Sequence, residues 1–142
     1  MGTRTWHLKR AAHHVDVAEH LAKTPDFIDW AVVALFYSAM HQVHSALSGD
    51  PDLSKDERHP RKHASPFPVE EGGRGTNQLV AATMPAINKA YRSLYEASRR
   101  TRYDILKLGD RSYDQFKEQL EQVTLNVGLL NKTRPDRPTE EP

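Results

Sequence analysis

The chain has 142 residues, which is enough for one domain with a buried core. Twenty Lys and Arg residues against nineteen Asp and Glu residues give a formal charge of +1, which excludes a strong overall field for nucleic acid or membranes. With 37% hydrophobic and 27% charged residues, the chain is too apolar for wholesale disorder. The absence of cysteine excludes disulfides, zinc–thiolate sites, iron–sulfur clusters and thiol nucleophiles.

The hydropathy pattern contains no run of 18 apolar residues, so we expect no transmembrane helix. Charged residues interrupt the first twenty positions at Arg4, Lys9, Arg10 and Asp16, which argues against a secretory signal. We therefore expect a soluble cytoplasmic protein that has no membrane partner.

The first half of the chain predicts two helices. Residues 4–23 place apolar side chains at steps of three and four, and Pro25 ends this segment. Asp26 is a candidate cap for the next helix, over residues 27–47. That second helix is apolar around most of its circumference, which predicts a position in the middle of a bundle.

A long connection follows at residues 49–75. It is rich in proline and glycine, and its charges are segregated, with acidic residues first and a basic cluster over residues 58–63. A structureless connection of this length is uncommon in a compact domain unless it is functional or disordered. We expect a basic loop here.

The remaining segments again have helical periodicity. Thr76 is a possible cap for a short helix through Thr83, and Pro85 suits the first turn of a following helix up to about residue 101. The pattern leaves open whether residues 76–101 form one kinked helix or two pieces. Gly109 marks a turn before the final helix.

The final helix carries the clearest apolar stripe: Tyr113, Phe116, Leu120, Val123, Val127 and Leu130. Ser112 and Gln115 have the spacing of a capping box at its start. We expect residues 133–142 to be a disordered tail. The sequence thus predicts an all-α, up-and-down four- or five-helix bundle, with a single domain over residues 1–132.

Two histidines of the second helix, His41 and His44, lie on one helical face below Tyr37. Two imidazoles on one face can bind a metal ion, but no Asp or Glu completes the set one turn away, so we predict neither a metal site nor a cofactor. The alternatives are core histidines with satisfied hydrogen bonds and a functional polar pocket, which Trp30 would help to line.

Arg58 and His63 have the spacing arginine, four residues, histidine. A metal-independent ribonuclease needs a histidine as general acid or base on the 2′-hydroxyl and an arginine to stabilise the developing phosphate charge. These two residues are the candidate catalytic pair. The alternative is a solvated basic loop, because a loop holds catalytic geometry less well than a rigid helix.

Residues 89–111 carry seven basic side chains against three acidic ones, which is a local excess of four. A phosphate-binding face is one interpretation, and a solvated helix face with internal ion pairs is the other. Arg102, Tyr103 and Asp104 lie near the end of this helical segment. Tyr103 and Asp104 could instead order the following loop.

Three segments in this order resemble the HEPN superfamily of small prokaryotic helical proteins: residues 29–47, 59–63 and 90–104. They carry the motifs Tyr-x-x-x-His, His-Pro-x-x-His and Tyr-x-x-Leu with a following Ser and Arg-Tyr. The matching residues are Tyr37, His41, His59, Pro60, His63, Tyr91, Leu94, Ser98, Arg102 and Tyr103.

The resemblance implies an up-and-down helical bundle that is often a homodimer. Some members are ribonuclease toxins that use Arg-x(4–6)-His, and others are nucleotide-binding modules or partners of small nucleotidyltransferases. Here the Arg-x4-His spacing falls in the long loop, so the leading prediction is a non-catalytic module that binds a nucleotide, RNA or a protein partner. That partner could be a nucleotidyltransferase or an antitoxin. The predicted ligand-binding residues are Tyr37, His41, His44, Arg61, Arg102, Tyr103 and Asp104. The alternative is an endoribonuclease toxin that uses Arg58 and His63.

Overall fold

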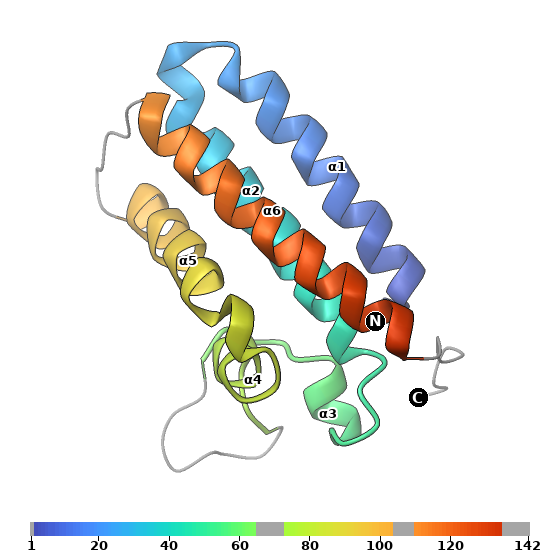
Figure 1. The fold of residues 1–142 in the computed structure, drawn as a ribbon. Coiled ribbons are helices and arrows are strands. Elements are labelled where there is room, and N and C mark those ends of the chain that lie inside the picture. Colours follow the sequence, from blue (N-terminus) through green and yellow to red (C-terminus); the bar gives the residue numbers. More distant parts are fainter. Residues whose placement is uncertain (1, 65–72, 104–109, 135–142) are drawn as a thin grey trace.

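A computed structural model describes residues 2–64, 73–103 and 110–134, and within those ranges the protein is all-α (Figure 1). This confirms the predicted fold class. In chain order the elements are α1 (Arg4–Ala22), η1 (Pro25–Phe27), α2 (Ile28–Leu47), α3 (Lys55–Arg58), α4 (Thr76–Thr83), η2 (Pro85–Ile87), α5 (Asn88–Tyr103) and α6 (Asp110–Thr133).

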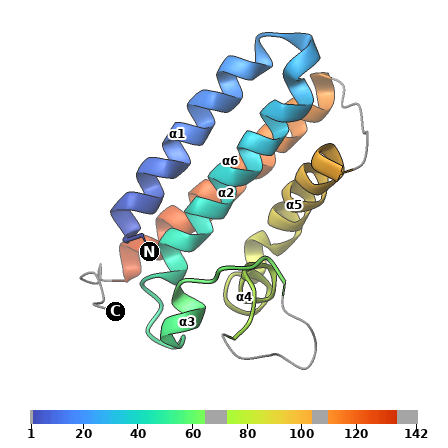
Figure 2. The ribbon, with the colours of Figure 1, turned by 180° about the vertical axis from the view of Figure 1, so that it is seen from behind.

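The four long helices α1, α2, α5 and α6 run up and down alternately and form a bundle (Figure 1). The short helices α3 and α4 lie together at one end, where α1 also begins and α6 ends. Seen from behind, α2 lies between α1 and α5, with α6 on its far side (Figure 2). No helix among the described residues is long and apolar enough to cross a membrane.

Helix α2 is the centre of the bundle, because it packs against α1, α5 and α6. Most of its side chains are buried, as its nearly uniform hydropathy predicts. Phe36 is fully buried, and its ring lies 5.8 Å from that of Tyr91 and 5.7 Å from that of Tyr95, both on α5. The final helix adds Leu120, Val123 and Val127 to the same core, which are members of its predicted apolar stripe.

The long connection is more ordered at its start than its composition suggests. Ser54 caps the one-turn helix α3 by accepting a hydrogen bond from the Glu57 backbone N–H. The carboxylate of Glu57 then forms a salt bridge of 2.8 Å with Arg74 across the loop. The expectation of a structureless segment is therefore wrong for residues 55–58.

Three predicted helix caps are wrong, two by one residue and the third by three. Asp26 lies inside the 3₁₀ turn Pro25–Phe27 that precedes α2, so Phe27 takes the N-cap position. Gly75, not Thr76, is the N-cap of α4, and its N–H donates to Gln78 Oε1 at 2.8 Å. Helix α6 begins at Asp110, before Ser112.

Gly75 is required by a close backbone approach, since a Cβ there would lie 2.7 Å from the backbone of His63 and Ala64. The region 76–101 is in pieces, with α4 separated from α5 by the 3₁₀ turn at Pro85.

The disordered tail was predicted to begin at residue 133. Thr133 is instead the last residue of α6, and the next residue, Arg134, makes two side-chain contacts with the bundle. Arg134 donates to the Ala46 carbonyl at 3.3 Å and forms a salt bridge of 3.4 Å with the buried carboxylate of Asp50. This hydrogen bond and this salt bridge hold the end of α6 against the end of α2. The rest of the predicted tail, residues 135–142, lies outside the described residues.

Candidate functional site

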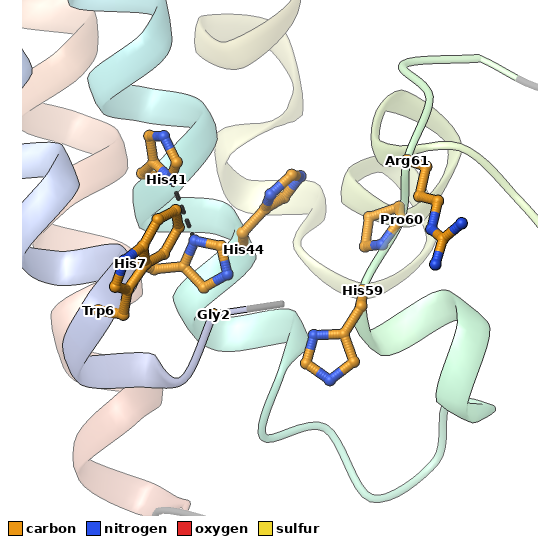
Figure 3. A pocket seen from close by; sticks show the side chains of 8 residues that line it. All are labelled: Gly2, Trp6, His7, His41, His44, His59, Pro60 and Arg61. Atoms are coloured by element: carbon orange, nitrogen blue, oxygen red, sulfur yellow. Dashed lines mark hydrogen bonds between the residues drawn. The ribbon is translucent and has the colours of Figure 1, made fainter. Parts of the chain in front are cut away.

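Histidines from two helices meet at the contact between α1 and α2. His7 of α1 is 7% exposed, and its Nδ1 lies 3.1 Å from Nδ1 of His41 on α2 (Figure 3). The ring of His44, one turn further along α2, lies 5.4 Å from that of His7. The structure therefore brings together the two predicted histidines, and it adds a third from α1.

A polar link ties this cluster to the basic loop. His44 Nε2 lies 3.0 Å from the hydroxyl of Thr76, the first residue of α4. The backbone N–H of Thr76 donates to the Lys62 carbonyl at 2.9 Å, and that of Asn77 donates to the His63 carbonyl at 2.7 Å. These bonds hold the loop beside the end of α2 without depending on any long side chain.

The loop and the histidines together enclose a pocket of about 410 Å³. Its lining residues are Gly2, Trp6, His7, His41, His44, His59, Pro60 and Arg61 (Figure 3). Trp6 is 48% exposed, and its indole packs edge-on at 5.0 Å from the His7 ring and 5.5 Å from the His41 ring. The pocket therefore combines an accessible aromatic ring with several imidazoles and one guanidinium.

The three histidines are neutral at physiological pH because burial opposes their charged forms. Burial, followed by the neighbouring His41, lowers the pKa of His7 to about 4. Burial lowers the pKa of His41 to about 4 and that of His44 to about 3, with smaller contributions from nearby imidazoles. These three rings consequently offer hydrogen-bond donors and acceptors without charge, and Arg61 adds a positive charge to the lining.

The contact between His7 and His41 also fixes a tautomer pattern. Two neutral imidazoles can share one Nδ1–H···Nδ1 hydrogen bond only if one ring carries its proton on Nδ1 and the other on Nε2. Their Nε2 atoms are then one acceptor and one donor.

A second aromatic cluster continues from the first along α2. His14 stacks on His41 at 5.5 Å with an interplanar angle of 8°, and it lies 5.7 Å from Tyr37. The hydroxyl of Tyr37 accepts a hydrogen bond of 3.0 Å from Arg102 Nη1. The predicted residues Tyr37, His41 and Arg102 thus form one continuous series that joins α1, α2 and α5.

His63 lies near this second cluster and outside the pocket. Its imidazole packs 5.6 Å from Phe36 and 5.2 Å from Tyr95. Burial lowers its pKa, and the positive charge of Arg102 lowers it further. The guanidinium of Arg58 instead donates to the Leu53 carbonyl at 2.6 Å, at the end of α3. The two residues of the predicted catalytic pair are therefore held by different surroundings.

The other predicted residues have different outcomes. Arg61 lines the pocket, and within the described residues it forms no salt bridge. Tyr103 is 74% exposed and lies against the Arg102 guanidinium, and Trp30 is 50% exposed and is not among the lining residues. Asp104 lies outside the described residues.

Sequence reasoning missed Trp6 and His7. The available signal was the stripe of His7, Ala11, His14 and Ala18, which share one helical face and are three or four residues apart. The apolar members of that stripe, Ala11 and Ala18, are buried, and of the two histidines on it His7 is buried and His14 is half-buried. This stripe could indicate a site shared with His41 only if α1 were already known to pack beside α2.

The described residues contain no group of three or more His, Asp or Glu side chains arranged to hold a metal ion. Comparison with known proteins gives no match to a protein-family model, to a curated protein or to a solved structure.

Proposed function

We propose that this protein is a non-catalytic, HEPN-like helical bundle that binds a nucleotide, or the end of an RNA strand, in the pocket between α1, α2 and the 59–61 loop. The observation that carries the proposal is the lining of the pocket: an accessible indole, neutral imidazoles and a guanidinium that forms no salt bridge within the described residues.

Each of these groups has a defined part in such binding. The Trp6 ring can stack on a nucleobase, which is worth about 1–3 kcal/mol in single-stranded nucleic-acid complexes. The Arg61 guanidinium can bind a phosphate with two parallel hydrogen bonds. The neutral imidazoles of the lining can each donate or accept one hydrogen bond with a polar group of the ligand. A volume of about 410 Å³ also falls within the usual range for small-molecule sites.

The surroundings of Arg58 and His63 support a non-catalytic function. Burial and Arg102 lower the pKa of His63 from its ordinary value, which disfavours a general acid but leaves a general base possible, so the support comes from the position of the two side chains. The Arg58 guanidinium is engaged with the Leu53 carbonyl at 2.6 Å. Neither group is placed to act on a phosphodiester in the pocket that we propose binds the ligand.

The proposal includes a homodimer and a protein partner of the nucleotidyltransferase or antitoxin class, as the HEPN resemblance implies. Four exposed large apolar side chains are candidate contact residues: Phe27 and Trp30 at the start of α2, and Leu125 and Leu129 on α6, each about half exposed or more. Light scattering tests the dimer, and a monomer at tens of micromolar would contradict it. A neighbouring gene for a nucleotidyltransferase would support the partner.

The main experiment titrates ATP and a short RNA into the Trp30→Phe variant, in which Trp6 is the remaining tryptophan. We expect saturable quenching of Trp6 fluorescence that weakens as salt increases, because phosphate contacts are screened and release counterions. Arg61→Ala should weaken binding about tenfold, which corresponds to one charge-assisted hydrogen bond. Arg92→Ala is the matched control, since Arg92 is an exposed arginine of α5 paired with Glu96.

An RNA-cleavage assay in EDTA separates this function from the ribonuclease alternative. We expect the wild-type protein to leave RNA intact. Cleavage by the wild type that His63→Ala abolishes would contradict the non-catalytic proposal. Quenching that is independent of salt and of Arg61 would contradict the phosphate-binding part of it.

A further inference from the structure

We propose that a single-stranded nucleic acid of about five nucleotides binds along the face that α1, α2 and α5 share, with one end in the pocket. The strand extends the ligand of the function proposed above, so the inference rests on that function. Seen from behind, α2 lies between α1 and α5 (Figure 2). The residues of this aromatic–basic face are Trp6, Arg10, His14, Tyr37, His41, Arg102 and Tyr103.

The aromatic rings of this face follow one another from the pocket to the middle of α2. The Trp6 indole, which lines the pocket, lies 5.5 Å from the ring of His41. His41 stacks on His14 at 5.5 Å, and His14 lies 5.7 Å from Tyr37. A ligand that leaves the pocket along α2 therefore meets a continuous line of rings.

Helix α5 continues this line through an arginine. The Cζ atom of Arg102 lies 5.7 Å from the centre of the Tyr37 ring and 5.3 Å from that of the Tyr103 ring. Its Nη1 donates to the Tyr37 hydroxyl and its Nε to the Ser98 carbonyl, which hold the guanidinium in place. Its Nη2 makes no hydrogen bond within the described ranges and can donate to a phosphate.

Arg10 supplies a second cation near the middle of the face. It comes one turn after Trp6 and one turn before His14 on α1, and both of those rings lie against His41. The aromatic–basic face contains no acidic residue, and in the part of the chain that the structure describes neither Arg10 nor Arg102 forms a salt bridge. The face is thus complementary to a chain of phosphates.

The two ends of the face are its most exposed rings, since Trp6 is about half exposed and Tyr103 is mostly exposed. A base of any identity can stack on such a ring, because every base has a π-face. The bases of a duplex are already paired and stacked, so they cannot cover these rings. The face therefore fits a single strand.

The length of the face sets the length of the strand. The path from Trp6 to Tyr103 consists of five steps of 5.3–5.7 Å each. This is room for roughly four to six extended nucleotides, near the lower end of the known range for single-strand sites.

The first test compares AMP with single-stranded oligoadenylates of increasing length by isothermal titration. We expect the affinity to rise up to about five nucleotides and then to level off, because longer strands leave the face. The salt dependence of the affinity should steepen by about 0.7 for each added phosphate contact. An RNA duplex should bind at least about tenfold more weakly than one of its strands, because its bases cannot stack on the exposed rings.

The second test uses residues of the face that do not line the pocket. Arg10→Ala should lower the ratio of pentanucleotide to AMP affinity about fivefold at 0.1 M salt and reduce the salt slope for the pentanucleotide by about 0.7. Tyr103→Ala should lower the same ratio at least about fivefold, because it removes a stacking ring. Lys9→Ala is the matched control, since Lys9 is an exposed cation on another side of α1.

Circular dichroism verifies that each variant is folded, and the two substitutions are made separately. Equal affinities and equal salt slopes for AMP and the pentanucleotide would overturn the extended face and leave the pocket function intact. A ratio that Lys9→Ala lowers as much as Arg10→Ala, or a duplex that binds as tightly as its strand, would also overturn it. If neither AMP nor the pentanucleotide binds, the pocket function fails as well.

Discussion

Helix α2 has two faces with different chemistry, one apolar and one that carries histidines. The face toward α5 is apolar: Phe36 is fully buried and in contact with two tyrosine rings. The face toward α1 carries His41 and His44, whose partners are another imidazole and a threonine hydroxyl. The first face stabilises the bundle through buried area. The second keeps polar groups satisfied but uncharged, and a pocket opens beside it.

This difference teaches where a binding site can form in a small bundle. Apolar packing leaves no volume for a ligand, because cores are filled to crystal-like density. Toward the end of α2 the buried apolar residues continue through Leu47, but the face toward α1 carries histidines, and the loop after α3 lines a pocket beside them. Five predictions test how separate the two faces are, in order of decreasing effect.

Truncation on the apolar face should have the largest effect. Phe36→Ala removes a fully buried ring and should lower the free energy of unfolding by about 3–5 kcal/mol. Urea denaturation at pH 7.5 measures it. Leu129→Ala is the control, because Leu129 is 55% exposed and should change stability by less than about 0.5 kcal/mol. Equal effects from the two substitutions would show that the core is misassigned.

Lowering the pH should lower the free energy of unfolding, because the buried histidines between α1 and α2 oppose protonation. The folded-state pKa values of His7 and His41 are about 4 and that of His44 is about 3, below the ordinary value of 6.5. The unfolded chain therefore binds more protons than the folded chain between these values. Their full stabilising contribution is present above pH 6.5, and it is lost as the pH falls toward 4.

The expected loss is on the order of 1 kcal/mol per histidine by pH 5, after allowance for the solvent that reaches these rings. Urea denaturation at pH 7.5, 6 and 5 measures it. His41→Gln should flatten the profile, whereas the exposed His20→Ala should leave it unchanged. A profile of the wild type that is flat over this range would contradict the neutral cluster.

The ion pair that closes the pocket end of the bundle should have a moderate effect. Arg134→Ala leaves the buried carboxylate of Asp50 without its cation and should lower the free energy of unfolding by about 1–3 kcal/mol. Lys132→Ala, an exposed change two residues away, is the control. No difference between these variants would mean that solvent already screens the pair.

A methyl group added at Gly2, in the pocket wall, should affect ligand binding more than stability. A Cβ at position 2 would clash with the Trp6 ring and lie 3.0 Å from His7 Nε2. Gly2→Ala should therefore displace the indole and weaken nucleotide binding several-fold, while the urea midpoint stays close to that of the wild type. Unchanged binding in the Trp30→Phe background would show that the ligand does not contact Trp6.

The smallest effect is expected where the two faces meet. Tyr37→Phe removes the acceptor of the Arg102 Nη1 hydrogen bond, which is 3.0 Å long, and should cost about 0.5–1.5 kcal/mol. The Arg102 guanidinium keeps its bond to the Ser98 carbonyl. Thermal denaturation measures the change, and a larger loss than that of Arg134→Ala would reverse the proposed order.

Periodicity was enough to predict the bundle but not the site. The apolar stripes of residues 4–23, 27–47 and 113–130 reported which faces are buried, because helical spacing alone decides that. Caps were less predictable, since a 3₁₀ turn before α2 and a glycine before α4 displaced the expected capping residues. Local hydrogen bonds decide those positions, and they depend on the path of the incoming chain.

The site could be predicted only in part because its residues come from separate elements. His41, His44 and Arg61 were predicted, and they line one pocket. Trp6 and His7 join them only because α1 packs beside α2, which is a tertiary fact that no local pattern contains. The pairing of Arg58 with His63 was inferred from spacing, but bonds to the Leu53 carbonyl and contacts with Phe36 hold the two side chains.

The most direct test of the account is an NMR titration of ¹⁵N-labelled protein with AMP. The account predicts that the Trp6 indole N–H and the ring nitrogens of His7 and His41 shift together and saturate, while the Trp30 indole signal stays in place. Shifts confined to the Arg99–Tyr103 end of α5, or no shifts at millimolar AMP, would contradict it.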